Sequence, residues 1–315
     1  MEVERPVWPD QAIWRASDLD EAARAIQPEA RRFQASDGYP LASLIWPARG
    51  DRPRARLILL HGVQSHAGWY HGLGRRLAAA GFECHFPDRR GSGANARERG
   101  HARSAQRLVD DVLEYAGALN DDRPKVLGGI SWGAKLALVA AARDPKIDSL
   151  LLIFPGLHPQ VDVTLRQKLG VALALLTGQG ARRTFPIPLA DPSLFTQDPA
   201  GQSFISGDPL SLRAATANLL FASRVLDRMV ATATNRVETP LLAILAEHDR
   251  IADNARTRGA FERFPSRIKR LVELEGTCHT PEFDANSAVY ARSIIDWLGA
   301  RQDEPWNKTN ANSGN

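Results

Sequence analysis

The feature that most constrains the fold is a serine set between two glycines, where an apolar strand turns into a helix. Residues 126–130 form an apolar run, residues 134–142 are rich in alanine and leucine, and Ser131 lies between them with Gly129 and Gly133 on either side. In this context the pattern GxSxG is typical of a nucleophile elbow, a turn that strains the serine backbone and leaves no room for side chains at the glycines. It predicts that Ser131 projects into a cleft. The alternative is a glycine-rich turn whose serine only caps the helix.

Strands and helices alternate on both sides of this turn. Most of the expected strands are continuous apolar runs, which is typical of strands buried on both faces of a parallel sheet. Residues 33–46 instead favour an antiparallel hairpin around Asp37-Gly38. The order predicts an α/β fold, with a mostly parallel central sheet, helices on both faces and ligands at the carboxyl ends of the strands. The expected strands are 33–35, 41–46, 57–60, 82–86, 126–130, 150–154, 241–245 and 268–274, and the expected helices are 69–80, 106–119, 134–142, 165–176, 210–229, 254–264 and 287–298.

The alternation is interrupted once, between residues 156 and 238, where two helical stretches replace the strands. We expect this segment to be a helical cap inserted into an α/β core made of residues 31–155 and 239–300. Residues 1–30 are expected to form an N-terminal arm packed on the core. Residues 301–315 are polar, and we expect a disordered tail there.

A serine hydroxyl is a weak nucleophile until a base takes its proton, so the elbow predicts a histidine that a carboxylate orients. Behind such an elbow the chain order is Ser, Asp, His. Of the eight histidines, only His248 and His279 lie beyond the expected cap and near the end of a strand. His279 lies between the last strand and the last helix, where its ring can reach Ser131. We predict His279 as the base and expect His248 to be a solvated loop residue.

The loop after residues 241–245 offers three carboxylates as the partner of His279. Asp249 is the predicted acid, because a short side chain just beyond the strand end can be buried against the histidine. Glu247 is closer to the strand, and Asp253 has the position of an N-cap for the next helix. The alternative for Asp249 is an ordinary turn residue.

Negative charge that develops on a substrate oxygen needs fixed donors, usually two backbone amides. Trp132, directly after the serine, is expected to supply one of them. The loop after residues 57–60 is expected to supply the other from Val63, because Gly62 permits a close approach of the backbone. We expect His61, in the same loop, to be structural.

We expect neither an organic cofactor nor a metal. The glycines at 72–74 and 91–93 lack the GxGxxG spacing of a dinucleotide fingerprint directly after a first strand. No histidines or cysteines are spaced as zinc ligands on a recognisable scaffold.

Several of these motifs together resemble the α/β-hydrolase superfamily, over about residues 31–300. Within it, the segment His61 to His66 followed by Tyr70 is similar to the monoacylglycerol lipase and lysophospholipase branch, which is related to the serine aminopeptidases S33. The resemblance implies a serine esterase with a helical lid. The residues that carry it are His61-Gly62, Asp88 with Arg90-Gly91-Ser92-Gly93, the elbow, Asp249-Arg250-Ile251 and His279.

The expected function is therefore hydrolysis of a carboxylic ester through an acyl-Ser131 intermediate. The substrate implied by the resemblance is a small molecule: a monoacylglycerol, a lysophospholipid or a similar monoacyl ester. An amidase or aminopeptidase of the same fold is the alternative, because the triad chemistry is the same and the cap selects the leaving group. A binding protein that has kept the fold without turnover is a further alternative.

Charge and composition bear on partners and location. The chain of 315 residues has 40 basic and 36 acidic residues and no basic run interleaved with aromatic residues, so no nucleic-acid partner is expected. The N-terminus is acidic where a secretion signal would be basic, and no run reaches the ~18 apolar residues of a membrane span. Two cysteines are too few for a disulfide framework. We expect a cytoplasmic protein without stable membrane insertion, and no pattern indicates its oligomeric state.

The cap carries two apolar stripes at helical spacing. Either they bury against the core, which is the usual fate of such a face, or they line an acyl pocket over Ser131. Under the second alternative Leu173 and Phe221 are the expected substrate-binding residues. The first stripe is Leu165, Leu169, Leu173 and Leu176, and the second is Leu219, Leu220, Phe221, Val225, Leu226 and Met229.

Overall fold

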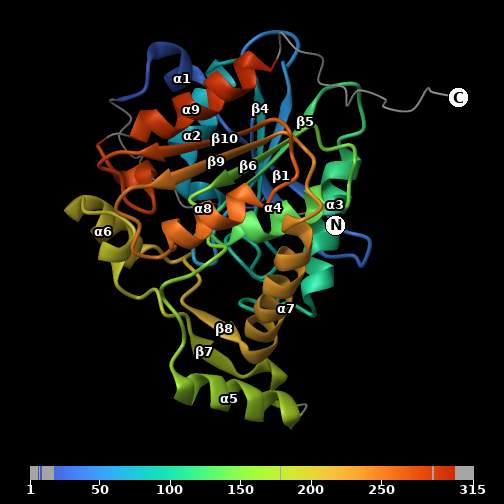
Figure 1. The fold of residues 1–315 in the computed structure, drawn as a ribbon, viewed down its shortest axis with the longest axis vertical. Helices are drawn as coiled ribbons and strands as arrows, with labels where there is room; N and C mark the ends of the chain where they lie inside the picture. Colours follow the sequence, from blue (N-terminus) through green and yellow to red (C-terminus); the bar gives the residue numbers. More distant parts are fainter. Residues whose placement is uncertain (1–5, 7, 9–17, 178, 286, 302–315) are drawn as a thin grey trace, which may run out of the picture.

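The structure is a computed structural model, and it describes residues 6, 8, 18–177, 179–285 and 287–301. Its centre is an eight-stranded sheet in the order β1-β2-β4-β3-β5-β6-β9-β10 (Figure 1). The β1–β2 and β2–β4 pairs are antiparallel and every other pair is parallel, so the expected mostly parallel sheet is confirmed. The strands are β1 (Glu29–Gln34), β2 (Pro40–Trp46), β3 (Arg56–Leu60), β4 (Glu83–Pro87), β5 (Lys125–Ile130), β6 (Ser149–Ile153), β9 (Leu241–Ala246) and β10 (Lys269–Leu274).

Helices cover both faces of the sheet. On one side α2 packs against α9, and on the other α3 packs against α4. None of the helices in the described part of the chain has the length and apolarity to cross a membrane. The helices outside the cap are α1 (Glu21–Ala25), α2 (His71–Ala79), α3 (Ala105–Ala118), α4 (Gly133–Ala141), α8 (Asn254–Glu262) and α9 (Ser287–Ala300).

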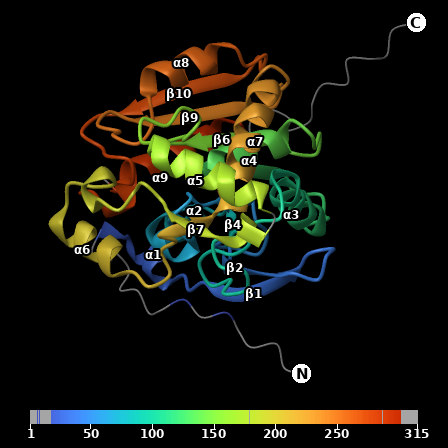
Figure 2. The ribbon, with the colours of Figure 1, turned by 90° about the horizontal axis from the view of Figure 1, so that it is seen from below.

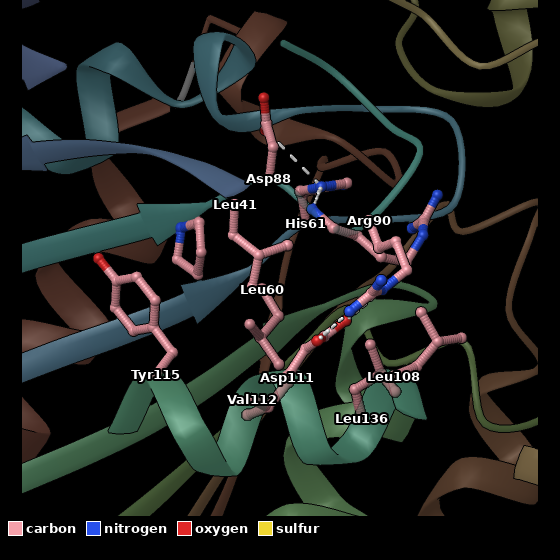
Figure 3. A pocket seen from close by; sticks show the side chains of 12 residues that line it. Leu41, Leu60, His61, Asp88, Arg90, Leu108, Asp111, Val112, Tyr115 and Leu136 are labelled. Carbon is pink, nitrogen blue, oxygen red and sulfur yellow. Dashed lines mark hydrogen bonds and ion pairs between the residues drawn. The ribbon is translucent and has the colours of Figure 1, made fainter. Parts of the chain in front are cut away.

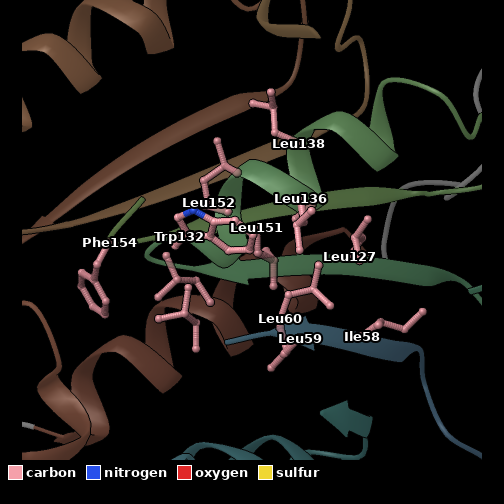
Figure 4. Packing of buried hydrophobic residues seen from close by; sticks show 14 of the residues in the cluster. Ile58, Leu59, Leu60, Leu127, Trp132, Leu136, Leu138, Leu151, Leu152 and Phe154 are labelled. Carbon is pink, nitrogen blue, oxygen red and sulfur yellow. The ribbon is translucent and has the colours of Figure 1, made fainter. Parts of the chain in front are cut away.

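One part of the hydrophobic core lies between the central strands and α4, and the cluster continues on the other face of the sheet under α2 and α9. Strands β5 and β6 are buried along their whole length, as their continuous apolar sequences predict. Helix α4 is also buried at every position, because the cap helix α7 (Ala217–Thr234) covers the side that faces away from the sheet. Figure 4 shows leucines of β3 and β6 converging on the start of α4. The core thus holds the turn between β5 and α4 rigidly.

The cap occupies the sequence between β6 and β9, where we expect it, but it is less regular than predicted. The second helix begins at Ala217, because Thr216 caps it by accepting a hydrogen bond from the Leu219 amide. The seven residues before Ala217 are not helical, and part of them pairs in a small sheet that the sequence analysis missed. Figure 1 shows this sheet and α5 below the main sheet, and Figure 2 looks onto them from that side. The cap elements are α5 (Leu165–Leu176), β7 (Thr184–Pro186), α6 (Pro199–Gly207), β8 (Ala214–Thr216) and α7.

Both ends of the chain lie largely outside the described residues. The expected tail, 301–315, is described only at Arg301, which is buried. In the expected arm, 1–30, the described part includes α1 and the first residues of β1. Trp8 donates a hydrogen bond from its Nε1 to Asp88, so this point of the arm contacts the core.

Candidate active site

The turn at Ser131 has the geometry that the GxSxG pattern predicts. The φ angle of Ser131 is 54°, in the left-handed region that side chains other than glycine rarely occupy. A Cβ atom at Gly129 would lie 2.4 Å from the Gly133 carbonyl oxygen, and one at Gly133 would lie 2.3 Å from that of Leu60. Both glycines are therefore required by close backbone contacts, and the serine is held in a strained position at the strand end.

Replacement of Gly133 by alanine is expected to lower the free energy of unfolding by at least about 1–3 kcal/mol, because the new methyl group must displace backbone atoms of β3. The matched control is Gly117→Ala in α3, where a Cβ meets no atom within 4 Å. Relief of the glycine penalty within a helix should make that variant about 0.5–1 kcal/mol more stable. Urea denaturation measures both. Equal stability of the two variants would contradict the predicted crowding at the elbow.

The structure brings the three predicted residues together, although they come from three separate loops. The His279 Nε2 atom lies 2.8 Å from the Ser131 Oγ atom, and the His279 Nδ1 atom lies 2.7 Å from the Asp249 Oδ2 atom. An ionised carboxylate can only accept, so Nδ1–H donates to Asp249 and the lone pair of Nε2 accepts the hydroxyl proton of Ser131. The histidine thus has the tautomer that a general base needs.

Asp249 is held as a carboxylate. Its Oδ1 atom accepts hydrogen bonds from the amides of Ile251 and Ala252, each at 2.8 Å. Burial is the largest influence and acts to raise the pKa of Asp249, but the His279 ring and the two amides outweigh it and hold the pKa below its ordinary value. The carboxyl is therefore ionised throughout the neutral range.

The other candidates of this loop have different places. His248 is half-exposed, as expected of a solvated residue. Asp253 caps α8 by accepting from the Arg256 amide, and Glu247 accepts from the Gly276 amide on the outside of the loop. Neither carboxylate contacts His279.

The two predicted oxyanion donors lie beside Ser131. The Trp132 amide follows the serine directly, and the backbone of Gly62 is so near that a Cβ atom there would lie 3.3 Å from the Cβ atom of Ser131. Among the described residues, neither the Val63 amide nor the Trp132 amide donates a hydrogen bond to a protein acceptor. Both are thus available to a substrate oxygen.

Comparison with known proteins gives the family. Residues 51–286 match the family described as serine aminopeptidase, S33. The chain belongs to this family. Monoacylglycerol lipase of Mycolicibacterium smegmatis is 25% identical over 276 residues, which cover 84% of this chain and 95% of that protein. Monoglyceride lipase of Rattus norvegicus is 26% identical over 279 residues, which cover 84% and 89%.

A solved structure agrees with the predicted fold. The crystal structure of a monoacylglycerol lipase from Paleococcus ferrophilus superposes with a TM-score of 0.71 at 24% identity, and covers 82% of this chain and 98% of that one. The predicted α/β-hydrolase fold is therefore confirmed, and so is the resemblance to the monoacylglycerol lipase branch. The chain is an enzyme of the hydrolase class.

A polar network behind the loop that follows β3, residues 61–66, which we call the oxyanion loop, was not predicted in detail. As expected, His61 is structural: its Nε2 atom accepts from the Arg89 amide, and its ring lies beside the buried Asp88. Asp88 accepts from the amides of Ala67 and Ala94. Figure 3 shows His61 and Asp88 on one side of a cavity of about 30 Å³, and the Arg90–Asp111 ion pair on another. The position of Asp88 directly after β4 was the available sequence signal.

The oxyanion loop is also tied to the cap. The Nε2 atom of buried His66 lies 2.9 Å from the Oδ2 atom of Asp208, and the same oxygen accepts from the Trp69 indole at 2.6 Å. Burial acts to raise the pKa of Asp208, but these two partners outweigh it and lower the pKa to about 2.

We expect the contacts of Asp208 with His66 and Trp69 to weaken in acid. Because folding depresses the pKa of Asp208, its contribution to stability is fully present above the ordinary carboxyl pKa of about 4 and is lost as the pH falls towards 2. The melting temperature of Asp208→Asn should therefore fall less between pH 5 and pH 2.5 than that of the unmodified protein. Equal falls would show that the Asp208 pKa is not depressed.

For the first apolar stripe of the cap, the structure contradicts the alternative of burial against the core. Its four leucines lie on α5 and are between 61% and 84% exposed, so they are not buried against the core. Leu173 and Phe221 are 61% and 50% exposed. In α7, by contrast, Leu219 and Leu226 are buried, as the alternative of core packing predicts.

Phe195, a cap residue in contact with the triad, was missed by the sequence analysis. Phe195 packs edge-on against the His279 ring, with 6.3 Å between ring centroids, and its carbonyl accepts from the Thr280 amide.

Within the described ranges, no three histidine, cysteine, aspartate or glutamate side chains are grouped as metal ligands.

Proposed function

We propose that this protein is a serine esterase that hydrolyses a monoacyl carboxylic ester, such as a monoacylglycerol or a lysophospholipid. The observation that carries the proposal is the hydrogen-bonded series Ser131, His279, Asp249 beside two unoccupied backbone amides. The names of the two relatives, a monoacylglycerol lipase and a monoglyceride lipase, support the substrate class.

In the proposed reaction the Ser131 hydroxyl attacks the ester carbonyl carbon while His279 takes its proton. The carbonyl oxygen becomes an oxyanion, which the amides of Val63 and Trp132 stabilise. The tetrahedral intermediate collapses when His279 gives the proton to the leaving alcohol, and an acyl-Ser131 ester remains. A water molecule, deprotonated by His279, then releases the carboxylic acid and restores the serine.

The first experiment combines an active-site label with a substrate panel. A fluorophosphonate probe should label the unmodified protein and leave Ser131→Ala unlabelled. The panel compares glyceryl, lysophospholipid, simple alkyl and aminoacyl substrates. Absence of labelling and of turnover in the unmodified protein would remove the proposal and favour a binding protein.

An amidase or aminopeptidase is the second candidate, because the description of the matched family is serine aminopeptidase. The same residues would act, and the leaving group would be an amine instead of an alcohol. Faster turnover of aminoacyl amides than of matched esters would favour this candidate over the esterase.

The pocket-lining role of Leu173 and Phe221 remains a prediction with a direct test. Each methylene that enters an apolar pocket contributes ~0.8 kcal/mol, so extending the acyl chain from four to eight carbons should raise kcat/KM by up to roughly 100-fold. Leu173→Gln or Phe221→Gln should flatten the profile without changing the melting temperature. Leu165→Gln, on the same exposed stripe, is the control. A profile that is flat from acetate upward would contradict an acyl pocket.

A further inference from the structure

The side chain of Arg89 lies against both halves of the predicted oxyanion hole. Arg89 follows β4 and is buried. Its Nη1 atom donates to the Gly62 carbonyl at 3.1 Å and its Nη2 atom donates to the Val63 carbonyl at 2.9 Å. Its guanidinium carbon lies 4.9 Å from the centroid of the Trp132 ring.

The hydrogen bond from Arg89 to the Gly62 carbonyl affects the direction of the Val63 N–H. In a trans peptide the carbonyl oxygen of one residue and the N–H of the next point in opposite directions from one rigid plane. The Gly62 oxygen also accepts from the Nδ1 atom of His61 at 2.8 Å, so Arg89 and His61 together hold this oxygen from behind and fix the direction of the Val63 N–H. The charge on the guanidinium also polarises that peptide, which strengthens its N–H as a donor.

The contact between Arg89 and the Trp132 ring concerns the second donor, the Trp132 amide. The Trp132 ring lies against the Arg89 guanidinium, and its Nε1 atom donates to Ser223 of α7 at 2.9 Å. The ring is thus fixed between the loop after β4 and the cap, next to the residue's own backbone N–H. The Arg89 side chain therefore contacts the peptide that carries one donor and the ring of the residue that carries the other.

Burial of this cation is unfavourable for stability by itself. Among the described residues no carboxylate forms an ion pair with Arg89, and its Nε atom is buried with no acceptor in that same part of the chain. Burial lowers the pKa of Arg89 to about 10, so the side chain is still charged at neutral pH. Its Nη2 atom also donates to the Ser92 hydroxyl at 3.2 Å, within its own loop. A buried cation whose other donors go to two carbonyls of the oxyanion loop favours a role in the site over a purely structural one.

We propose that Arg89 is a positioning residue that orients the Val63 and Trp132 amides towards the oxyanion. The inference rests on the proposed function, because an oxyanion forms only if acyl transfer takes place at Ser131. In this proposal Arg89 acts through the two amides and not by touching the substrate.

The test compares Arg89→Met and Arg89→Lys with a matched control, Arg99→Met. Arg99 also donates to backbone carbonyls, those of Gly93, Leu210 and Ser211, but none of these belongs to the oxyanion loop. For p-nitrophenyl butyrate, Arg89→Met should lower kcat about 10- to 100-fold, somewhat less than the loss of a whole oxyanion donor, and leave KM within about twofold. Arg89→Lys should lose about 5-fold, because an ammonium cannot donate in one plane to two carbonyls. Arg99→Met should keep kcat within about threefold.

A second readout separates positioning from folding. An alkyl trifluoromethyl ketone forms a tetrahedral adduct with the serine and needs the oxyanion hole, whereas the matching alcohol does not. In Arg89→Met the inhibition constant of the ketone should rise in parallel with the loss of kcat, and that of the alcohol should not change. If Arg89→Met does not fold, the same comparison is made with Arg89→Lys.

Three outcomes would overturn the inference. They are a kcat in Arg89→Met equal to that of Arg99→Met, equal weakening of ketone and alcohol, and a wild-type kcat in Arg89→Lys where that is the only folded variant. Each of these outcomes counts against the inference only if the unmodified protein hydrolyses the ester and reacts with the fluorophosphonate. If the unmodified protein does neither, the proposed function fails, and the role of Arg89 fails with it.

Discussion

Replacement of Ser131 or His279 by alanine is expected to lower kcat by roughly four to six powers of ten while the protein remains folded. Ser131 supplies the attacking oxygen, and His279 is the group within hydrogen-bond distance of that oxygen that can take its proton. Loss of either residue ends the same chemical path. The measurement is kcat on a p-nitrophenyl ester, with the melting temperature as the control for folding.

The double variant Ser131→Ala/His279→Ala makes this prediction sharper. Because the two residues act as one unit, the activity of the double variant should be scarcely lower than that of either single variant. The residual rate would come from binding and from the Val63 and Trp132 amides. Multiplicative losses in the double variant would show that the two residues act independently, and that the 2.8 Å contact has no catalytic meaning.

The elbow and the sheet could be predicted from the sequence because their causes are local. Gly129 and Gly133 are required by contacts within a few residues or with the neighbouring strand, and buried parallel strands need continuous apolar runs. The loops at the carboxyl ends of β5, β9 and β10 must then lie at one edge of the sheet. That topology alone brings Ser131, Asp249 and His279 near each other.

The cap and the network behind the oxyanion loop could not be predicted in the same way. Helical periodicity on α5 shows an apolar face but not what covers it, and the structure leaves Leu173 exposed. The contacts of Arg89 with the Gly62 and Val63 carbonyls depend on tertiary distances that no spacing encodes. The same is true of Phe195, which lies 84 residues from the histidine that it packs against.

Replacement of Asp249 by asparagine should lower kcat by roughly 10⁴, although the substitution changes almost no volume. The structure gives a specific reason. Two amides, those of Ile251 and Ala252, already donate to Oδ1, so the asparagine oxygen must take that place and its NH₂ group must face His279. An NH₂ group donates, so the Nδ1 atom of His279 would have to accept.

The proton of the neutral His279 ring then moves to Nε2, where it faces the Ser131 hydroxyl and cannot accept the serine proton. The melting temperature should change little, because all the hydrogen bonds of the loop can still form. Asp253→Asn is the matched control: asparagine is as good an N-cap as aspartate, and that side chain caps α8 without contacting the histidine. If Asp253→Asn instead loses activity while Asp249→Asn keeps it, the acid has been assigned to the wrong residue of this loop.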